Sequence, residues 1–230
     1  MCFSPLASFS ASAALTATGV AAFAISANRP QRILSGIPIL FAIQQLAEGM
    51  LWLSLTRQGW EGWEIVSMYS FLVFAQVIWP VYVPLCMLLF EGDAKRKKLL
   101  KMLLLSGLAF SVYAAFALWY YPVSASVAQH HIRYILGYEL ASKWYYGLLY
   151  FIPTILAPLA SGSRRLHWLG YLFFGSYLAA RLLFHFYVIS VWCFFGAVIS
   201  LLVLYLVRYG TDKEEERLVL ENINSKNAGN

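Results

Sequence analysis

The stretch LHWLGYLFFGSYLAARLLFHFYVISVWCFFGAVISLLVLYLVR, residues 166–208, decides the fold. It is an apolar run of roughly 43 residues, and a helix of that length would be about 65 Å long at about 1.5 Å per residue. The hydrocarbon core of a bilayer is only about 30 Å thick. We therefore expect the run to turn back around residues 187–190 and to form two membrane spans, at 166–186 and 189–208.

Five further apolar segments precede this run, at 6–27, 34–56, 65–90, 99–121 and 144–161. The chain is 60% hydrophobic and 12% charged, whereas about a quarter of the residues are charged in a typical soluble domain. We therefore predict an all-α fold, a polytopic membrane bundle of seven transmembrane helices that occupies residues 1–210. Residues 211–230 are rich in acidic side chains and are expected to form a solvated cytoplasmic tail.

Lysine and arginine residues fall almost entirely on one side of this predicted bundle. That side holds Arg29, Arg32, Lys95, Arg96, Lys97, Lys98, Lys101, Arg164, Arg165, Arg208, Lys213, Arg217 and Lys226. The other side holds Arg57, Arg133 and Lys143. Because cytoplasmic loops carry an excess of Lys and Arg, we expect an outside N-terminus and a cytoplasmic C-terminus. The basic balance then reflects loops that face anionic lipid, and it requires no nucleic acid as partner.

Polar residues in two of the expected spans define a candidate site near the outer face. Gln44 and Glu48 lie four residues apart on the second span, and Tyr177, Arg181 and His185 follow each other at four-residue steps on the sixth. Residues four apart share one face of a helix. Both spans run from the inside outward, so these side chains are expected at similar depths. A charge in hydrocarbon is costly, and such a gathering is a functional-site hypothesis by default.

Two interpretations of this gathering remain open. In the first, Glu48 and Arg181 form a buried ion pair that only neutralises two charges and fixes the packing of their helices. In the second, the pair is joined by His185, which contacts a ligand or transfers protons, because the pKa of histidine lies closest to neutrality.

The three cysteines differ in their expected surroundings. Cys86 is expected deep in the third span as a packed apolar thiol. Cys2 and Cys193 are expected near the outer edge, as part of the candidate site or as a disulfide, which an oxidising compartment would permit. No CxxC or HxxxH spacing occurs, and Arg181 would repel a cation, so we expect no metal. The residues identify no cofactor.

The outer loop, residues 122–143, carries apolar side chains at helical spacing. Ile132, Ile135, Leu136 and Leu140 would share one face of a helix. We therefore expect an interfacial helix that lies over the mouth of the site, with His131 facing solvent.

Four short motifs together resemble an uncharacterised family of small bacterial multi-pass membrane proteins. They are MCFS at 1–4, QQLAEGMLW at 44–52, WP at 79–80 and WCFF at 192–195. The resemblance implies a multi-pass protein of the bacterial cytoplasmic (inner) membrane. It supplies no established catalytic residues.

Two classes of function are compatible with these features. The first is a membrane protein that binds a small ligand or a lipid headgroup near its outer face. Its pocket residues would be Cys2, Gln44, Glu48, Tyr177, Arg181, His185 and Cys193. The second is a membrane-embedded hydrolase or transferase that uses Cys2, Glu48 or His185. Ceramidase-type hydrolases hold their metal with several His together with Ser and Asp, but Asp occurs here only at 93 and 212. Binding is therefore the favoured interpretation, with the lipid bilayer as a partner and the oligomeric state left open.

Overall fold

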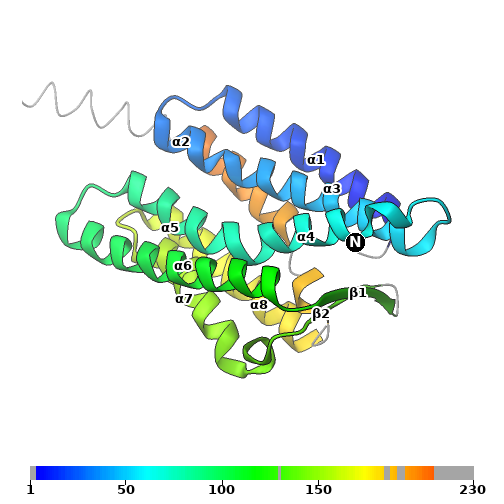
Figure 1. Cartoon of the computed structure of the whole chain (residues 1–230). Helices are drawn as coiled ribbons and strands as arrows, with labels where there is room; N and C mark the ends of the chain where they lie inside the picture. Colours follow the sequence, from blue (N-terminus) through cyan, green and yellow to red (C-terminus); the bar gives the residue numbers. More distant parts are fainter. Residues whose placement is uncertain (1–3, 129–130, 184–186, 191–194, 210–230) are drawn as a thin grey trace, which may run out of the picture.

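Helices dominate the structure and mostly run side by side, with a β-hairpin at one end (Figure 1). The computed structural model describes residues 4–128, 131–183, 187–190 and 195–209. Their helical character confirms the main feature expected from the sequence.

The order of the elements follows the expected apolar segments closely. The first part of the chain forms α1 (Pro5–Ala24), α2 (Arg29–Leu34), α3 (Gly36–Thr56), η1 (Glu61–Trp63), α4 (Glu64–Leu72), η2 (Val73–Ile78), α5 (Trp79–Phe90) and α6 (Ala94–Tyr120). It is followed by β1 (Val123–Ala128), β2 (His131–Leu136), η3 (Glu139–Ser142), α7 (Trp144–Ala160), α8 (Arg164–Leu183) and a last described helix, Gly196–Tyr209.

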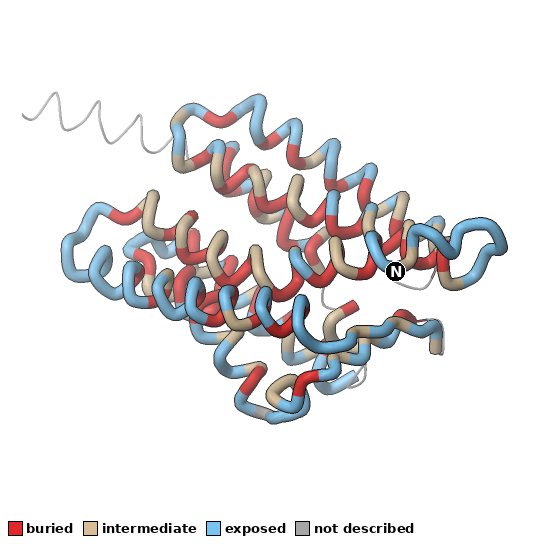
Figure 2. The backbone as a smooth tube through the Cα atoms, viewed as in Figure 1, coloured by how far each residue is buried: buried red, intermediate tan, exposed pale blue. Residues whose placement is uncertain are grey.

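Four helices in the described part of the chain are long and apolar enough to cross a membrane: Pro5–Ala24, Arg29–Thr56, Glu61–Phe90 and Ala94–Tyr120. The helices Tyr145–Ala160 and Gly196–Tyr209 are also apolar but shorter. Large apolar side chains of α6 such as Leu105, Val112 and Trp119 are exposed. Exposed positions recur along the whole of this helix (Figure 2). Helices that are apolar all round are typical of membrane spans.

Polar side chains set the beginnings of several helices. The Asn28 side chain accepts a hydrogen bond from the Gln31 N–H at the start of α2, and Asp93 accepts one from the Arg96 N–H at the start of α6. Asn and Asp are favoured at this position because their side-chain oxygens satisfy N–H groups that have no partner within the helix. The polar loops between the apolar segments therefore also supply the residues that cap the helices.

A π-helical turn, η2, interrupts the long helix between α4 and α5. It directly precedes Trp79 and Pro80, whose nitrogen cannot donate a hydrogen bond. Ser111 on α6 donates a hydrogen bond of 2.7 Å to the Val77 carbonyl, so a neighbouring helix satisfies one acceptor of the irregular turn. The turn brings Gln76 and Trp79, both buried, to the wall of one cavity.

The largest core cluster joins residues from the two halves of the chain. It includes Leu15, Leu34, Phe41, Trp79, Met87, Leu103, Ile155, Leu169, Phe173, Ile199 and Val203. Gly107 lets α6 approach α5, because a Cβ at this position would clash with the Pro80 carbonyl oxygen. The helices therefore share one core, which fixes where residues distant in sequence meet.

The loops that link α5 to α6 and α7 to α8 are joined through Glu91. Its buried carboxylate accepts hydrogen bonds from the N–H groups of Gly92, Asp93 and Gly162. Burial alone would raise the pKa of this carboxyl, but these hydrogen bonds and the Arg96 guanidinium together lower it below its ordinary value. The carboxylate therefore stays ionised and holds the two loops together.

The basic loops gather at one end of the bundle. Arg165 donates a hydrogen bond of 2.7 Å to the Tyr209 carbonyl, which joins the start of α8 to the end of the last described helix. The beginning of α2 and the α5–α6 loop lie at this same end, opposite the hairpin (Figure 1). The loops that are rich in Lys and Arg therefore lie together at one end of the structure.

The expectation of an interfacial helix between residues 122 and 143 is wrong, although the described chain as a whole is mostly helical. β1 and β2 form an antiparallel hairpin in which Val123 pairs with Leu136 and Ala128 with His131. Along β2 the side chains of Ile132 and Tyr134 face inward, whereas that of Ile135 is exposed. This alternation has the period of a strand, and β-branched and aromatic residues fit a half-buried strand well.

His131 was expected to face solvent, and this is also wrong. Its side chain is buried at the start of β2, and its ring stacks on that of Tyr187 with 4.7 Å between the centroids. The hairpin itself is held to α4 by a stacked pair, Phe71 and Tyr134, whose centroids are 4.8 Å apart. These contacts fix β2 against the helices.

Candidate functional site

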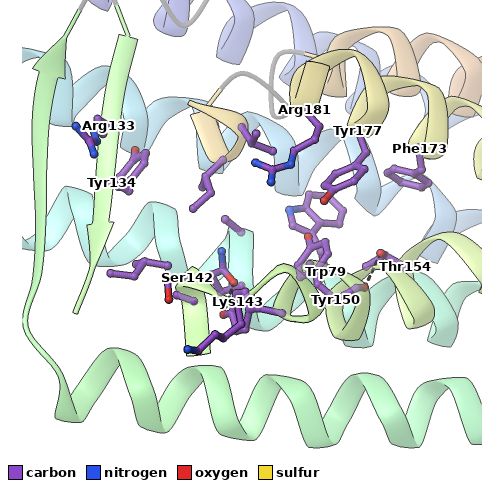
Figure 3. Close-up of a pocket in the computed structure, with 18 of the residues that line it drawn as sticks. Trp79, Arg133, Tyr134, Ser142, Lys143, Tyr150, Thr154, Phe173, Tyr177 and Arg181 are labelled. Atoms are coloured by element: carbon purple, nitrogen blue, oxygen red, sulfur yellow. Dashed lines mark hydrogen bonds between the residues drawn. The ribbon is translucent and has the colours of Figure 1, made fainter. Parts of the chain in front are cut away.

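A cavity of about 650 Å³ lies between the hairpin, α7, α8 and the middle of the α4–α5 helix (Figure 3). We call it the cationic cavity, because Arg133, Lys143 and Arg181 all line it. Its other lining residues include Phe41, Ala75, Gln76, Trp79, Val83, Tyr134, Ser142, Tyr146, Gly147, Tyr150, Thr154, Phe173, Tyr177 and Ile189.

Aromatic and aliphatic side chains form one wall of the cationic cavity. The rings of Phe41 and Trp79 pack at 4.1 Å between centroids, with Val83 and Phe173 beside them in the same core cluster. This wall is therefore continuous with the hydrophobic core. It offers an apolar surface to any bound molecule.

The basic side chains come from three different elements. Arg133 is exposed on β2, Lys143 precedes α7, and Arg181 is near the end of α8. In Figure 3 the Arg181 guanidinium extends from α8 toward the open centre of the cavity. The described lining residues include these three basic side chains and neither Asp nor Glu.

Lys143 takes part in a local ion pair. Its Nζ lies 2.7 Å from Glu139 Oε1, and both side chains are substantially exposed. Exposed pairs of this kind are typically worth less than about 1 kcal/mol. An anionic ligand could therefore replace Glu139 as the partner of Lys143 at small cost in free energy.

A chain of neutral polar groups closes the side of the cavity nearest η2. The Tyr146 hydroxyl donates to Gln76 Oε1 over 2.8 Å, and the Tyr138 and Tyr146 hydroxyl oxygens are 2.8 Å apart. Since the Tyr146 proton goes to Gln76, Tyr138 is the donor between the two tyrosines. Burial raises the pKa of Tyr138, which lies between β2 and η3, so this group stays protonated and neutral.

The polar residues expected on the second span lie directly behind the cavity wall. Gln44 Oε1 accepts a hydrogen bond of 2.8 Å from Trp79 Nε1, and Trp79 lines the cavity. Glu48 is fully buried and accepts hydrogen bonds from Gln45 Nε2 at 3.2 Å and from Ser190 Oγ at 2.5 Å. Both residues therefore support the wall, and Glu48 is not among the described residues that line it.

The residues predicted for the site thus divide into three groups. Tyr177 and Arg181 line the cationic cavity, and Gln44 and Glu48 lie behind it. Cys2, His185 and Cys193 lie outside the described residues. An ion pair between Glu48 and Arg181 stays a prediction, as does a disulfide between Cys2 and Cys193.

Sequence reasoning missed several residues of the cavity, although signals for them existed. Arg133 and Lys143 are two of the three basic residues on the side that the positive-inside rule leaves nearly uncharged. Gln76 is the only amide side chain within an apolar stretch, residues 65–90. Each is conspicuous for its position, and each lines the cavity.

The described residues contain no group of three or more His, Cys, Asp or Glu side chains that could hold a metal ion. Cys86 is a free and fully buried thiol in the core, as expected for a packed residue. Among the described side chains, the cavity therefore offers hydrogen-bond donors and positive charge rather than metal ligands.

Comparison with known proteins gives one match. No curated protein and no solved structure matches the chain. The model of a family of unknown function, DUF6629, matches residues 1–217. This agrees with the resemblance to an uncharacterised family, and because the match spans nearly the whole sequence, the chain belongs to the DUF6629 family.

Proposed function

We propose that this protein is an integral membrane protein that binds a small ligand or a lipid headgroup in the cationic cavity. The observation that carries the proposal is the cavity itself, about 650 Å³ in volume, whose lining combines basic side chains from three elements with aromatic rings. Binding pockets for small molecules are typically about 300–1,000 Å³, with mostly apolar walls and a few polar groups that orient the ligand.

The proposed membrane arrangement has seven spans, an outside N-terminus and a cytoplasmic C-terminus. Its support is the gathering of the basic loops at one end of the bundle, with the hairpin and the cationic cavity toward the other (Figure 1). In this arrangement α7, α8 and the last helix join the four longer helices as spans. The cavity then opens toward the outer face.

The proposed location is the cytoplasmic membrane of a bacterium. The support for it is the resemblance of four sequence motifs to small bacterial multi-pass proteins, together with the apolar helices. The basic loops would then face anionic lipid on the cytoplasmic side.

An enzyme that uses Glu48 is a weaker candidate. The Glu48 carboxylate is fully buried, and Gln45 and Ser190 already donate hydrogen bonds to it. A catalytic acid or base must come within hydrogen-bond reach of the substrate proton. Glu48 therefore fits a supporting role behind the pocket, and Cys2 or His185 would have to carry any chemistry.

Extraction of the purified protein tests the proposal. Full-length protein is purified in detergent, and bound molecules are identified by mass spectrometry of the denatured sample. We expect a retained molecule in the parent and its loss in Gly147→Leu, because residue 147 lines the cavity. A Cβ at Gly147 would meet only the Tyr177 hydroxyl, at 3.0 Å, the far end of a flexible side chain.

Gly175→Leu is the matched control, because a Cβ there meets nothing within 4 Å. It adds the same side chain to a neighbouring helix and should retain the molecule. Equal retention by both variants, or no retained molecule in the parent, would contradict binding in this cavity.

A further inference from the structure

We infer that the ligand of the cationic cavity is an anionic amphiphile, with a phosphate or carboxylate group beside the basic residues and an apolar part against the aromatic wall. This inference rests on the proposed binding function and adds the chemistry of the ligand.

The basic side chains of the lining favour an anion. Arg133, Lys143 and Arg181 are separated by at least about ten residues in sequence, yet all line one cavity. Attraction between a basic side chain and an anion is stronger where water is partly excluded than in bulk water. Basic side chains on the lining of a cavity therefore favour an anionic ligand.

The chemistry of the basic side chains favours an oxyanion. Two of the three basic residues are arginines, whose planar guanidinium can donate two parallel hydrogen bonds to phosphate or carboxylate. Hydroxyl groups of Ser142 and Tyr177 lie on the same lining and can donate further hydrogen bonds to an oxyanion. These are the donors that an oxyanion requires.

The aromatic wall of the cavity favours an apolar group in the ligand. Phe41, Trp79 and Phe173 are all buried, and together with Val83 they present carbon surface to the cavity. A free inorganic anion would leave this surface against water, whereas a hydrocarbon chain would cover it. Burial of apolar area gives about 25 cal/mol per Å², so the aromatic wall favours an amphiphile over its headgroup alone.

Calorimetric titration of the full-length protein in detergent tests this inference. The probes are dioctanoyl phosphatidylglycerol, dioctanoyl phosphatidylcholine and inorganic phosphate. We expect the anionic lipid to bind at least about tenfold more tightly than the zwitterionic lipid with the same chains, because each tenfold is only about 1.4 kcal/mol. Phosphate that binds as tightly as the anionic lipid would overturn the amphiphile and identify a free anion as the ligand.

Substitutions locate the binding. Arg133→Gln and Arg181→Gln should each weaken binding of the anionic lipid about tenfold or more, and Arg133→Lys should restore part of the loss. Arg57→Gln is the matched control, since Arg57 is exposed and lies outside the cavity lining. Binding that also weakens steeply with added salt, in folded variants checked by gel filtration and circular dichroism, supports the ionic contact.

The outcomes separate this inference from the proposed function. Equal binding of the two lipids, unaffected by the arginine substitutions but abolished by Gly147→Leu, would overturn the anionic ligand and leave the binding function intact. Failure of every probe, together with an empty extract from the purified protein, would overturn both.

Discussion

Trp79 Nε1 donates a hydrogen bond of 2.8 Å to Gln44 Oε1, and both side chains are buried. Trp79 lines the cationic cavity on one side, and Gln44 belongs to α3 on the other. The bond therefore links the aromatic wall of the cavity to the polar face of α3. A similar link runs from Glu48 to Ser190, whose neighbour Ile189 lines the cavity.

Removal of the indole donor should destabilise the protein. Trp79→Phe keeps an aromatic ring but leaves a buried amide oxygen without this donor, which should lower the free energy of unfolding by about 1–3 kcal/mol. Trp168→Phe makes the same change at an exposed position of α8 and should have an effect below about 0.5 kcal/mol. Thermal unfolding in detergent measures both, and equal melting of the two variants would contradict a structural role for this bond.

The hydrogen bond between Ser190 and Glu48 should also stabilise the fold. A hydrogen bond to a charged group is worth about 1.5–3 kcal/mol, so Ser190→Ala should destabilise the fold by that amount. Ser106→Ala is the control, because the Ser106 hydroxyl bonds only the Leu103 carbonyl of its own helix in the described part of the chain. If Ser190→Ala has no further effect in a Glu48→Gln background, the bond to the carboxylate is the cause of the loss.

A double-mutant cycle tests the ion pair expected between Glu48 and Arg181. If they are partners, Glu48→Gln alone should cost about 3–5 kcal/mol, because it leaves a charge without compensation. Glu48→Gln combined with Arg181→Gln should then recover most of the loss. Additive effects of the two substitutions would show instead that Arg181 serves the cavity and Glu48 the wall behind it.

The hydrogen bonds that Glu91 accepts from the α5–α6 and α7–α8 loops should make the stability of the fold depend on pH in acid. Burial opposes ionisation of this carboxyl, but the hydrogen bonds from backbone N–H groups and Arg96 outweigh it and lower the pKa in the folded protein. A lowered pKa means that the stabilisation is present above the pKa of the unfolded chain and is lost as pH falls through that of the folded state.

Comparison with Glu91→Gln isolates this contribution. The parent should be more stable than Glu91→Gln at neutral pH, and the difference should shrink to nothing in acid, below the ordinary range for glutamate. Glu64→Gln, at the other end of the bundle, is the control. The free energy of unfolding of both proteins is measured from neutral pH to strong acid. A difference between parent and variant that does not change with pH would contradict a contribution from the ionised Glu91 carboxylate.

Much of the helical framework could be predicted because its cause is local. Most of the apolar segments are bounded by charged or capping residues such as Asn28 and Asp93, and helices begin at these residues. Apolar length and capping chemistry are properties of short stretches of sequence. The same reasoning identified Tyr177 and Arg181, which do line the cavity.

The hairpin could not be predicted in this way, because its pattern is ambiguous. Ile132 and Leu136 are four residues apart and fit one helix face, but with Tyr134 between them they also fit one face of a strand. The contact that favours the strand, stacking of Tyr134 on Phe71, joins residues far apart in sequence. The assignment of Arg133 to the cavity depends on this choice, and so it was missed.

Labelling of single cysteines tests the proposed membrane arrangement, on which the outer position of the cavity depends. Cys2 and Cys193 are replaced by Ser, whereas Cys86 can stay because it is fully buried. Gln58→Cys and Ser126→Cys, at exposed positions near the hairpin end, should react with a membrane-impermeant maleimide on intact cells. Lys97→Cys, in the basic end of the bundle, should react only after lysis, because the positive-inside rule assigns this loop to the cytoplasm. The reverse pattern would turn the cationic cavity toward the cytoplasm, where it would meet soluble anions and inner-leaflet lipid instead of ligands from outside.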